Sequence, residues 1–178
     1  MLTKDDLEAA AEAVAYEAKM LCFTASALPG GLAERFGDEP TFERNAFLES
    51  FLLHARVLDE FLSSTGRRAS DVVAAHYIPG EYPIPTAFIG NERSAIDRQL
   101  AHLTTMRRMG KNFRVQRIAL TLAAGYLDFA RQLFARDDGT YWVIAEAAAD
   151  VREWLDAMAQ HRAARSDGVA IEDVYTGS

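Results

Sequence analysis

The spacing of apolar residues most limits what this chain can fold into, because they return every three or four positions along most of its length. One such seam consists of Phe47, Phe51, His54, Leu58 and Phe61, with steps of four, three, four and three. At ~3.6 residues per turn, these side chains lie along one stripe of an α-helix. The period-two alternation of a strand is not found over any comparable length. The sequence therefore predicts an all-α protein.

Glycines, prolines and polar N-caps divide the chain into five long predicted helices. These are expected near residues 3–28, 41–64, 92–109, 112–135 and 141–164, with a short helical piece from Ser70. The stretch 79–90 holds three prolines and two glycines, which predicts an extended connection. We expect an up-and-down bundle of four to five long helices with one short extra helix. It forms a single domain over residues 1–165, followed by a weakly structured tail at 166–178.

Composition and charge favour a cytoplasmic protein without a membrane segment. A hydrophobic content of 49% is sufficient for a core, and the net charge of −7 argues against broad attraction to nucleic acid. The single cysteine, Cys22, cannot form an intramolecular disulfide and is expected to be buried. The N-terminal residues lack a hydrophobic signal core, and no run approaches the ~18 apolar residues of a membrane span.

One segment departs from this acidic balance. Between residues 92 and 117, seven basic residues stand against two acidic ones, a net charge of +5. Four of them step by four, three and three: Arg107, Lys111, Arg114 and Arg117. If the helix continues through Gly110, these cations line one face and could bind RNA or DNA phosphates. The alternative, which we favour, is a solvated face paired with acids such as Glu43 or Glu49.

Two polar residues fall at inward positions of the predicted helix 41–64. His54 lies on the apolar seam, so we expect a buried imidazole bonded to a hydroxyl or carbonyl of a neighbouring helix. Asp59 lies near the core edge, where it could orient a histidine or an arginine from another helix. Arg56 is expected to pair with Glu60 at i+4.

The other histidines are predicted to lie nearer the surface. His102 flanks the seam of its helix beside Arg98, either as a boundary residue or as a general acid or base at a cleft edge. His76 is expected to favour the C-terminal end of the short helix, and His161 to be exposed. The helical metal-ligand spacings E-x-x-H and H-x-x-x-H do not occur. No metal or cofactor is predicted.

The motifs LLHAR at 52–56 and RQLAHLT at 98–104 resemble those of HEPN-type helical proteins. The resemblance covers roughly residues 43–135. It implies a bundle of four or five helices that often dimerises, and an RNase activity in many members. Their usual motif is an arginine, four to six residues and then a histidine, with a polar residue just after the arginine. Here the histidine corresponds to His102 and the polar residue to Asp97, whereas Ile96 occupies the arginine position.

These observations lead us to expect an RNA-binding protein or a metal-independent RNase of a defence or toxin–antitoxin type system, acting as a homodimer. His102 would act as acid or base, and an arginine would stabilise the developing charge. The candidate catalytic residues are His102, His54, Arg98, Arg107 and Asp59. Two alternatives stay open. One is a non-enzymatic dimeric or partner-binding module with a structural histidine network, and the other is a metal-binding bundle enzyme.

Overall fold

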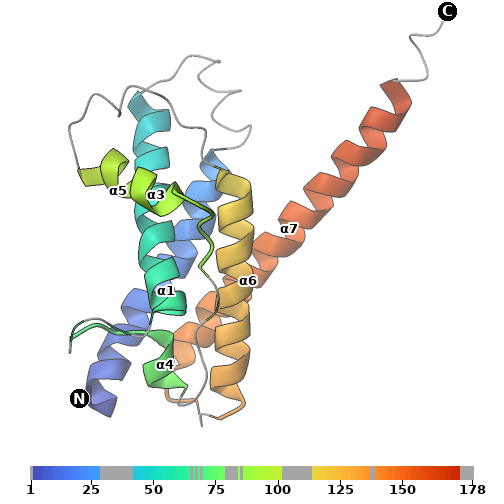
Figure 1. Cartoon of the computed structure of the whole chain (residues 1–178). Helices are drawn as coiled ribbons and strands as arrows, with labels where there is room; N and C mark the ends of the chain where they lie inside the picture. The colour runs from blue at the N-terminus through green and yellow to red at the C-terminus, as the bar shows by residue number, and fades with distance from the viewer. Residues whose placement is uncertain are drawn as a thin grey trace, which may run out of the picture.

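A computed structural model describes residues 2–28, 42–64, 66, 68, 70–78, 84, 86–101, 114–136 and 139–172. All regular structure within these ranges is helical, which confirms the predicted all-α class. The helices are α1 (Lys4–Ala27), α3 (Phe42–Ser63), α4 (Ala74–Tyr77), α5 (Glu92–Ala101), α6 (Val115–Phe134) and α7 (Trp142–Glu172). Four of them are long, and α4 and α5 are short (Figure 1). None of these helices combines the length and apolarity that crossing a bilayer requires.

Two helix boundaries differ from the sequence prediction. Helix α6 begins at Val115 instead of residue 112, because Arg114 has ψ 63° and lies outside the helical region. Helix α7 continues to Glu172, beyond the predicted end near 164, since its alanine-rich sequence contains no proline. The part of the predicted helix 92–109 beyond Ala101 lies outside the described residues.

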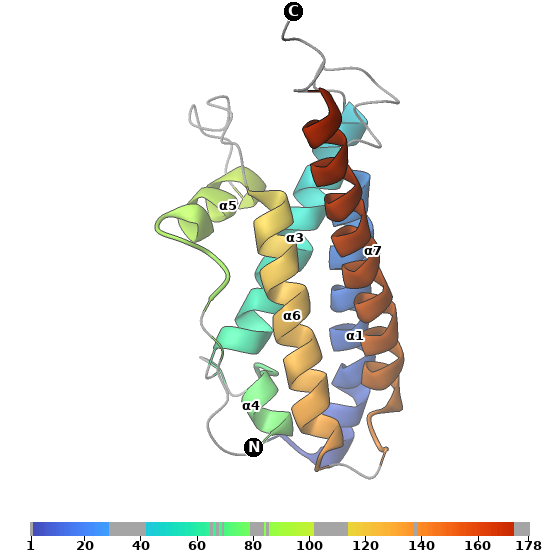
Figure 2. The same cartoon turned by 90° about the vertical axis from the view of Figure 1, so that its right-hand side faces the viewer.

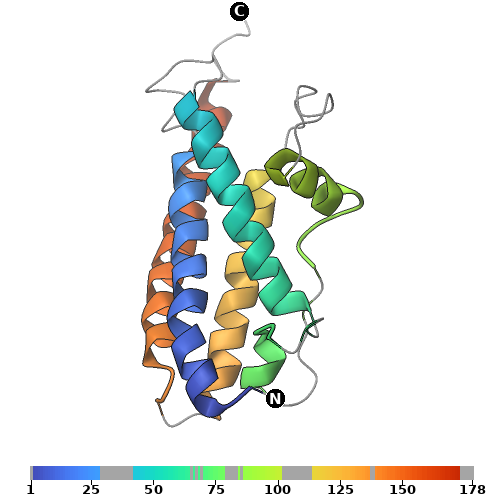
Figure 3. The same cartoon turned by 90° about the vertical axis from the view of Figure 1, so that its left-hand side faces the viewer.

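The four long helices surround one core. Helix α1 packs between α3 and α7, and α6 closes the bundle by packing on α3 and α7 (Figures 2 and 3). Helices α1 and α7 run in one direction and α3 and α6 in the other, because the connection through α4 and α5 returns the chain before α6 begins. The largest fully buried side chains include Phe51, Tyr126, Phe129, Leu122 and Ile144, contributed by α3, α6 and α7.

Capping and tertiary contacts hold α1 in place. Thr3 Oγ1 accepts from the Asp6 N–H at 3.2 Å, and Asp6 Oδ2 accepts from the Thr3 N–H at 2.8 Å, which confirms the predicted N-cap. At the opposite end, Trp154 of α7 donates to Ser26 Oγ of α1 at 2.7 Å. Lys19 of α1 forms ion pairs with two acids of α7, Glu146 and Asp150.

The connection before α5 lies on the bundle where the structure describes it. The Ile84 N–H donates to the Leu62 carbonyl of α3 at 3.2 Å. The Ile84 side chain lies against Gly125 of α6, in space that a Cβ at residue 125 would occupy. This glycine allows the connection to approach α6 closely, so the described part of 79–90 lies against both α3 and α6.

Candidate functional site

His54 is buried at the contact between α1 and α3, as predicted, with 7% of its surface exposed. Its Nδ1 lies 2.7 Å from Glu17 Oε2, and the edge of the Tyr16 ring packs against the imidazole. The expected hydroxyl or carbonyl partner is wrong, since the partner is a carboxylate. Glu17 was missed, although its spacing from Val14 and Leu21 places it beside the apolar seam of α1.

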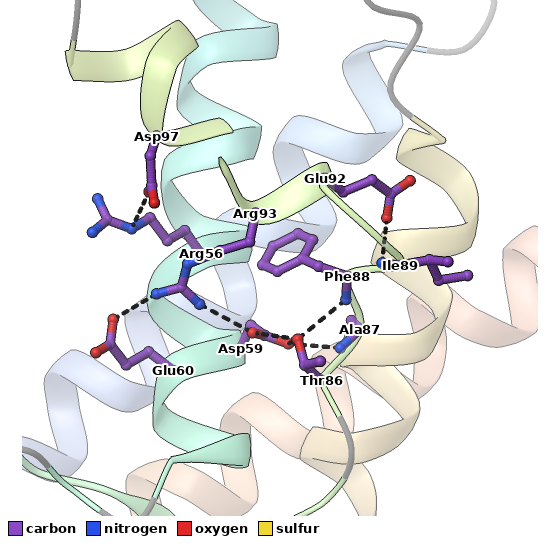
Figure 4. A network of polar contacts seen from close by, with 10 residues as sticks. All are labelled: Arg56, Asp59, Glu60, Thr86, Ala87, Phe88, Ile89, Glu92, Arg93 and Asp97. Atoms are coloured by element: carbon purple, nitrogen blue, oxygen red, sulfur yellow. Dashed lines mark hydrogen bonds and ion pairs between the residues drawn. The ribbon is translucent and has the colours of Figure 1, made fainter. Parts of the chain in front are cut away.

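Asp59 lies on the other side of α3 and is 1% exposed. It accepts hydrogen bonds from Thr86 Oγ1 at 2.8 Å, from the Ala87 N–H at 2.7 Å and from Arg93 Nη1 at 3.2 Å (Figure 4). Arg93 belongs to α5, so the prediction that Asp59 orients an arginine of another helix is confirmed. These partners satisfy a buried carboxylate and attach the start of α5 to α3.

Arginines of α3 and α5 extend this network (Figure 4). Arg93 Nη2 pairs with Glu60 Oε2 at 2.8 Å, while Arg56 Nε pairs with Asp97 Oδ1 at 3.0 Å. The predicted pair between Arg56 and Glu60 is therefore wrong. Its cause is the crossing of α5 over α3, which places Arg93 beside Glu60 and Asp97 beside Arg56.

Arg117, a predicted phosphate-binding residue, is paired internally. Its guanidinium donates to the Ala87 carbonyl at 2.7 Å and to Glu92 Oε2, so the acid that pairs with Arg117 is Glu92. Burial alone would raise the pKa of Glu92. The Ile89 N–H bond and the nearby guanidinium of Arg117 outweigh burial and hold this pKa below its ordinary value.

The predicted basic row is not continuous on one helix. Arg114 is exposed and precedes the first helical residue of α6, so a helix does not pass through it. His102, Arg107 and Lys111 lie outside the described residues, as does the side chain of Arg98. The described candidates form two separate groups, His54 with Glu17 and Asp59 with Arg93.

The remaining titratable candidates have local explanations. His76 lies in the last turn of α4, as predicted, and its Nδ1 accepts from the Val73 N–H at 3.3 Å. His161 is exposed and Cys22 is buried, as predicted, and burial raises the pKa of the Cys22 thiol to about 12. Within the described ranges, no three side chains of the metal-binding types come together.

A second feature, which the sequence interpretation missed, is an apolar surface on the outside of α1 and α3. This α1–α3 face is formed by Ala13, Tyr16, Met20, Phe23, Ala46, Phe47, Leu53 and Val57, all at least partly exposed. The rings of Phe23 and Phe47 pack 6.2 Å apart across the two helices, which lie side by side in Figure 3. Its signal was available, because Tyr16, Met20 and Phe23 form a second apolar stripe opposite the seam.

A hollow of about 440 Å³ adjoins this face, between α1, α3 and residues 71–73. Apolar side chains form most of its wall: Ala10, Ala13, Val14, Val57, Leu58, Phe61, Val72 and Val73. Three acids also line it, Glu17, Glu60 and Asp71. Ala13 and Val57 belong to both the hollow and the α1–α3 face, so the two surfaces are continuous.

Comparison with protein-family models, with curated proteins and with solved structures finds no match to this chain in any of the three.

Proposed function

We propose that this protein is a non-enzymatic helical module that binds an amphipathic helix of another protein on its α1–α3 face. One observation carries the proposal, the exposure of large apolar side chains on two adjacent helices. Tyr16 is 54%, Phe23 60%, Leu53 47% and Val57 41% exposed. A contiguous apolar surface of this kind is typical of interaction sites, and an amphipathic helix binds such a surface through its own apolar side chains.

The polar candidates support a structural role. His54 pairs with Glu17, Asp59 is satisfied by three groups of the connection and α5, and Arg117 pairs with Glu92. A catalytic base needs access to its substrate, and a phosphate-binding cation needs a free positive charge. These three side chains are instead engaged in holding helices together, which fits a protein that acts through its surface.

Charge favours a different protein over a second copy of this chain. The chain carries a net charge of −7, and Glu8, Glu12 and Glu43 are exposed on the two helices that form the face. Isologous pairing through this face would bring like charges together. The homodimer implied by the HEPN resemblance is therefore an alternative outcome of the test. A cytoplasmic location, with its reduced thiols, belongs to the same proposal.

The test uses a synthetic peptide helix with a leucine stripe and glutamine at its other positions. We expect fluorescence anisotropy to show binding to the wild type, and a Kd at least about tenfold weaker for Tyr16→Ser combined with Leu53→Ser. Trp142→Ser is the matched control, because Trp142 is equally exposed but lies on α7. Equal binding by all three proteins would contradict the proposal. Sedimentation of the protein alone tests self-association, and a dimer dissociated by the same double substitution would replace the partner helix with a second copy.

The RNase hypothesis is tested in parallel with a mixed RNA pool in the presence of EDTA. We expect no cleavage by the wild type. Cleavage that survives EDTA and disappears in His102→Ala would overturn the non-enzymatic proposal.

A further inference from the structure

We propose that the partner helix is basic, and that one of its lysine or arginine side chains enters the hollow beside the α1–α3 face. This inference rests on the proposed function and adds the chemistry of the partner. The inference follows from three properties of the hollow. Its wall is mostly apolar, acidic side chains line it, and it shares residues with the exposed α1–α3 face.

The hollow matches the two parts of a long basic side chain. Its volume of about 440 Å³ falls within the range of ligand pockets, ~300–1,000 Å³. Val57, Phe61 and Val72 offer an apolar wall to the methylene stem, while Glu17 and Glu60 offer carboxylates to the charged end. Lysine and arginine commonly bury the stem on apolar surface in this way and keep the charged group at polar partners.

Two of the carboxylates, those of Glu17 and Glu60, retain the capacity to accept another cation, whereas Asp71 Oδ2 already accepts from the Arg68 N–H at 2.8 Å. Glu17 contacts His54 through Oε2, and Glu60 contacts Arg93 through Oε2, whereas Oε1 of each makes no hydrogen bond to a described residue. Arg93 also pairs with the buried Asp59, so one guanidinium faces two carboxylates at this point. An added guanidinium or ammonium would balance this negative charge.

The hollow adjoins the α1–α3 face, where the partner helix is proposed to bind. Ala13 on α1 and Val57 on α3 line the hollow and also belong to the α1–α3 face. A helix bound along this face at Ala13 and Val57 therefore lies beside the hollow. Covering the carboxylates with a neutral or acidic residue would remove water from them without compensation, which selects against such partners.

The experiment compares three peptide helices that share the leucine stripe and carry lysine, glutamine or glutamate at their polar positions. We expect the lysine peptide to bind about tenfold more tightly than the glutamine peptide, and the glutamate peptide to bind most weakly. The preference for lysine should fall as salt is raised, since part of the interaction is exposed to solvent.

Two double variants separate the hollow from general charge attraction. Glu17→Gln with Glu60→Gln removes two charges from the hollow and keeps one acceptor oxygen in each side chain, whereas Glu153→Gln with Asp156→Asn removes two exposed charges of α7. We expect the first variant to reduce the lysine preference to about twofold and the second to leave it unchanged. Glu60→Gln alone is the further hollow variant if the first fails to fold.

The outcomes distinguish this inference from the function on which it rests. Equal loss of lysine preference in both double variants would overturn the inference. Binding of the glutamine peptide that still depends on Tyr16 and Leu53 would leave the proposed function standing. If no peptide binds in a manner that depends on these two residues, both proposals fail.

Discussion

Helix α3 has two sides of opposite character. Toward α1 it exposes Leu53 and Val57, which belong to the apolar α1–α3 face. Toward α5 it carries Arg56, Asp59 and Glu60, each paired with a residue of α5 or of the connection that precedes it. We call this second region the α3–α5 corner. The polar side chains are engaged by the fold, with Oε1 of Glu60 as the exception, while the apolar side chains of Leu53 and Val57 are exposed.

The buried charge of α3 is explained by the fold, whereas the exposed apolar residues of the same helix are not. A buried carboxylate persists only where other groups satisfy it, and Asp59 obtains those groups from residues 86, 87 and 93. Its polarity is explained by architecture. Exposed aromatic side chains gain no comparable stability from the fold, and for this reason we place the proposed partner on the α1–α3 face.

The largest expected effect lies in the α3–α5 corner. Asp59→Ala should reduce the free energy of unfolding by roughly 3–5 kcal/mol, because it leaves the Arg93 guanidinium and the Ala87 N–H without their buried acceptor. Urea denaturation measures this loss. Glu60→Ala, at a half-exposed member of the same corner, is the control and should cost under about 1 kcal/mol. Similar losses for the two variants would contradict the structural role of Asp59.

Leu52 and Leu53 are neighbours in α3 but differ in exposure, so their substitutions should differ in their effect on stability. Leu52 is fully buried, so Leu52→Ala should cost roughly 2–4 kcal/mol through lost burial and the cavity that remains. Leu53→Ala should change stability by less than about 0.5 kcal/mol, since Leu53 is on the exposed face. Thermal or urea unfolding of both variants provides the measurement. A large loss at Leu53 would mean that this side chain serves the core instead of a partner.

The smallest expected effect is the pH dependence at Glu92, where the α3–α5 corner meets α6. Its folded-state pKa lies below the ordinary value of 4.5, so its stabilising contribution is present above that pH and disappears as pH falls through the folded pKa. Glu92→Gln should therefore lower stability by about 1 kcal/mol at pH 7 and by less at pH 3. Unfolding curves at both pH values test this, and an equal loss at pH 3 would contradict it.

Much of the fold could be predicted from apolar spacing alone. The seams that predicted α1, α3, α6 and α7 depend on local periodicity, which each segment carries by itself. The parallel direction of α3 and α6 was not predictable in the same way, because it depends on where α4 and α5 lie on the bundle (Figure 2). The continuation of α7 to Glu172 was also missed, since helix ends without proline are weakly marked.

The burial of the candidate site residues could be predicted from the sequence, but the residues that they bond to could not. The burial of His54 and Asp59 followed from their places on α3. Their partners did not, because Glu17 and Arg93 lie 37 and 34 residues away in sequence and meet them only after the helices pack. The α1–α3 face shows the reverse difficulty. Its apolar residues were visible in the sequence, but only the arrangement of helices reveals that no described segment covers them.

Helix α7 carries both tryptophans of the chain, Trp142 and Trp154. The second of these donates to Ser26 near the C-terminal end of α1, three residues after Phe23 of the α1–α3 face. Intrinsic fluorescence therefore reports how α7 docks on this end of α1. A partner that changes the tryptophan spectrum on binding would have altered this contact between α7 and α1, whereas an unchanged spectrum would mean that binding leaves the contact intact.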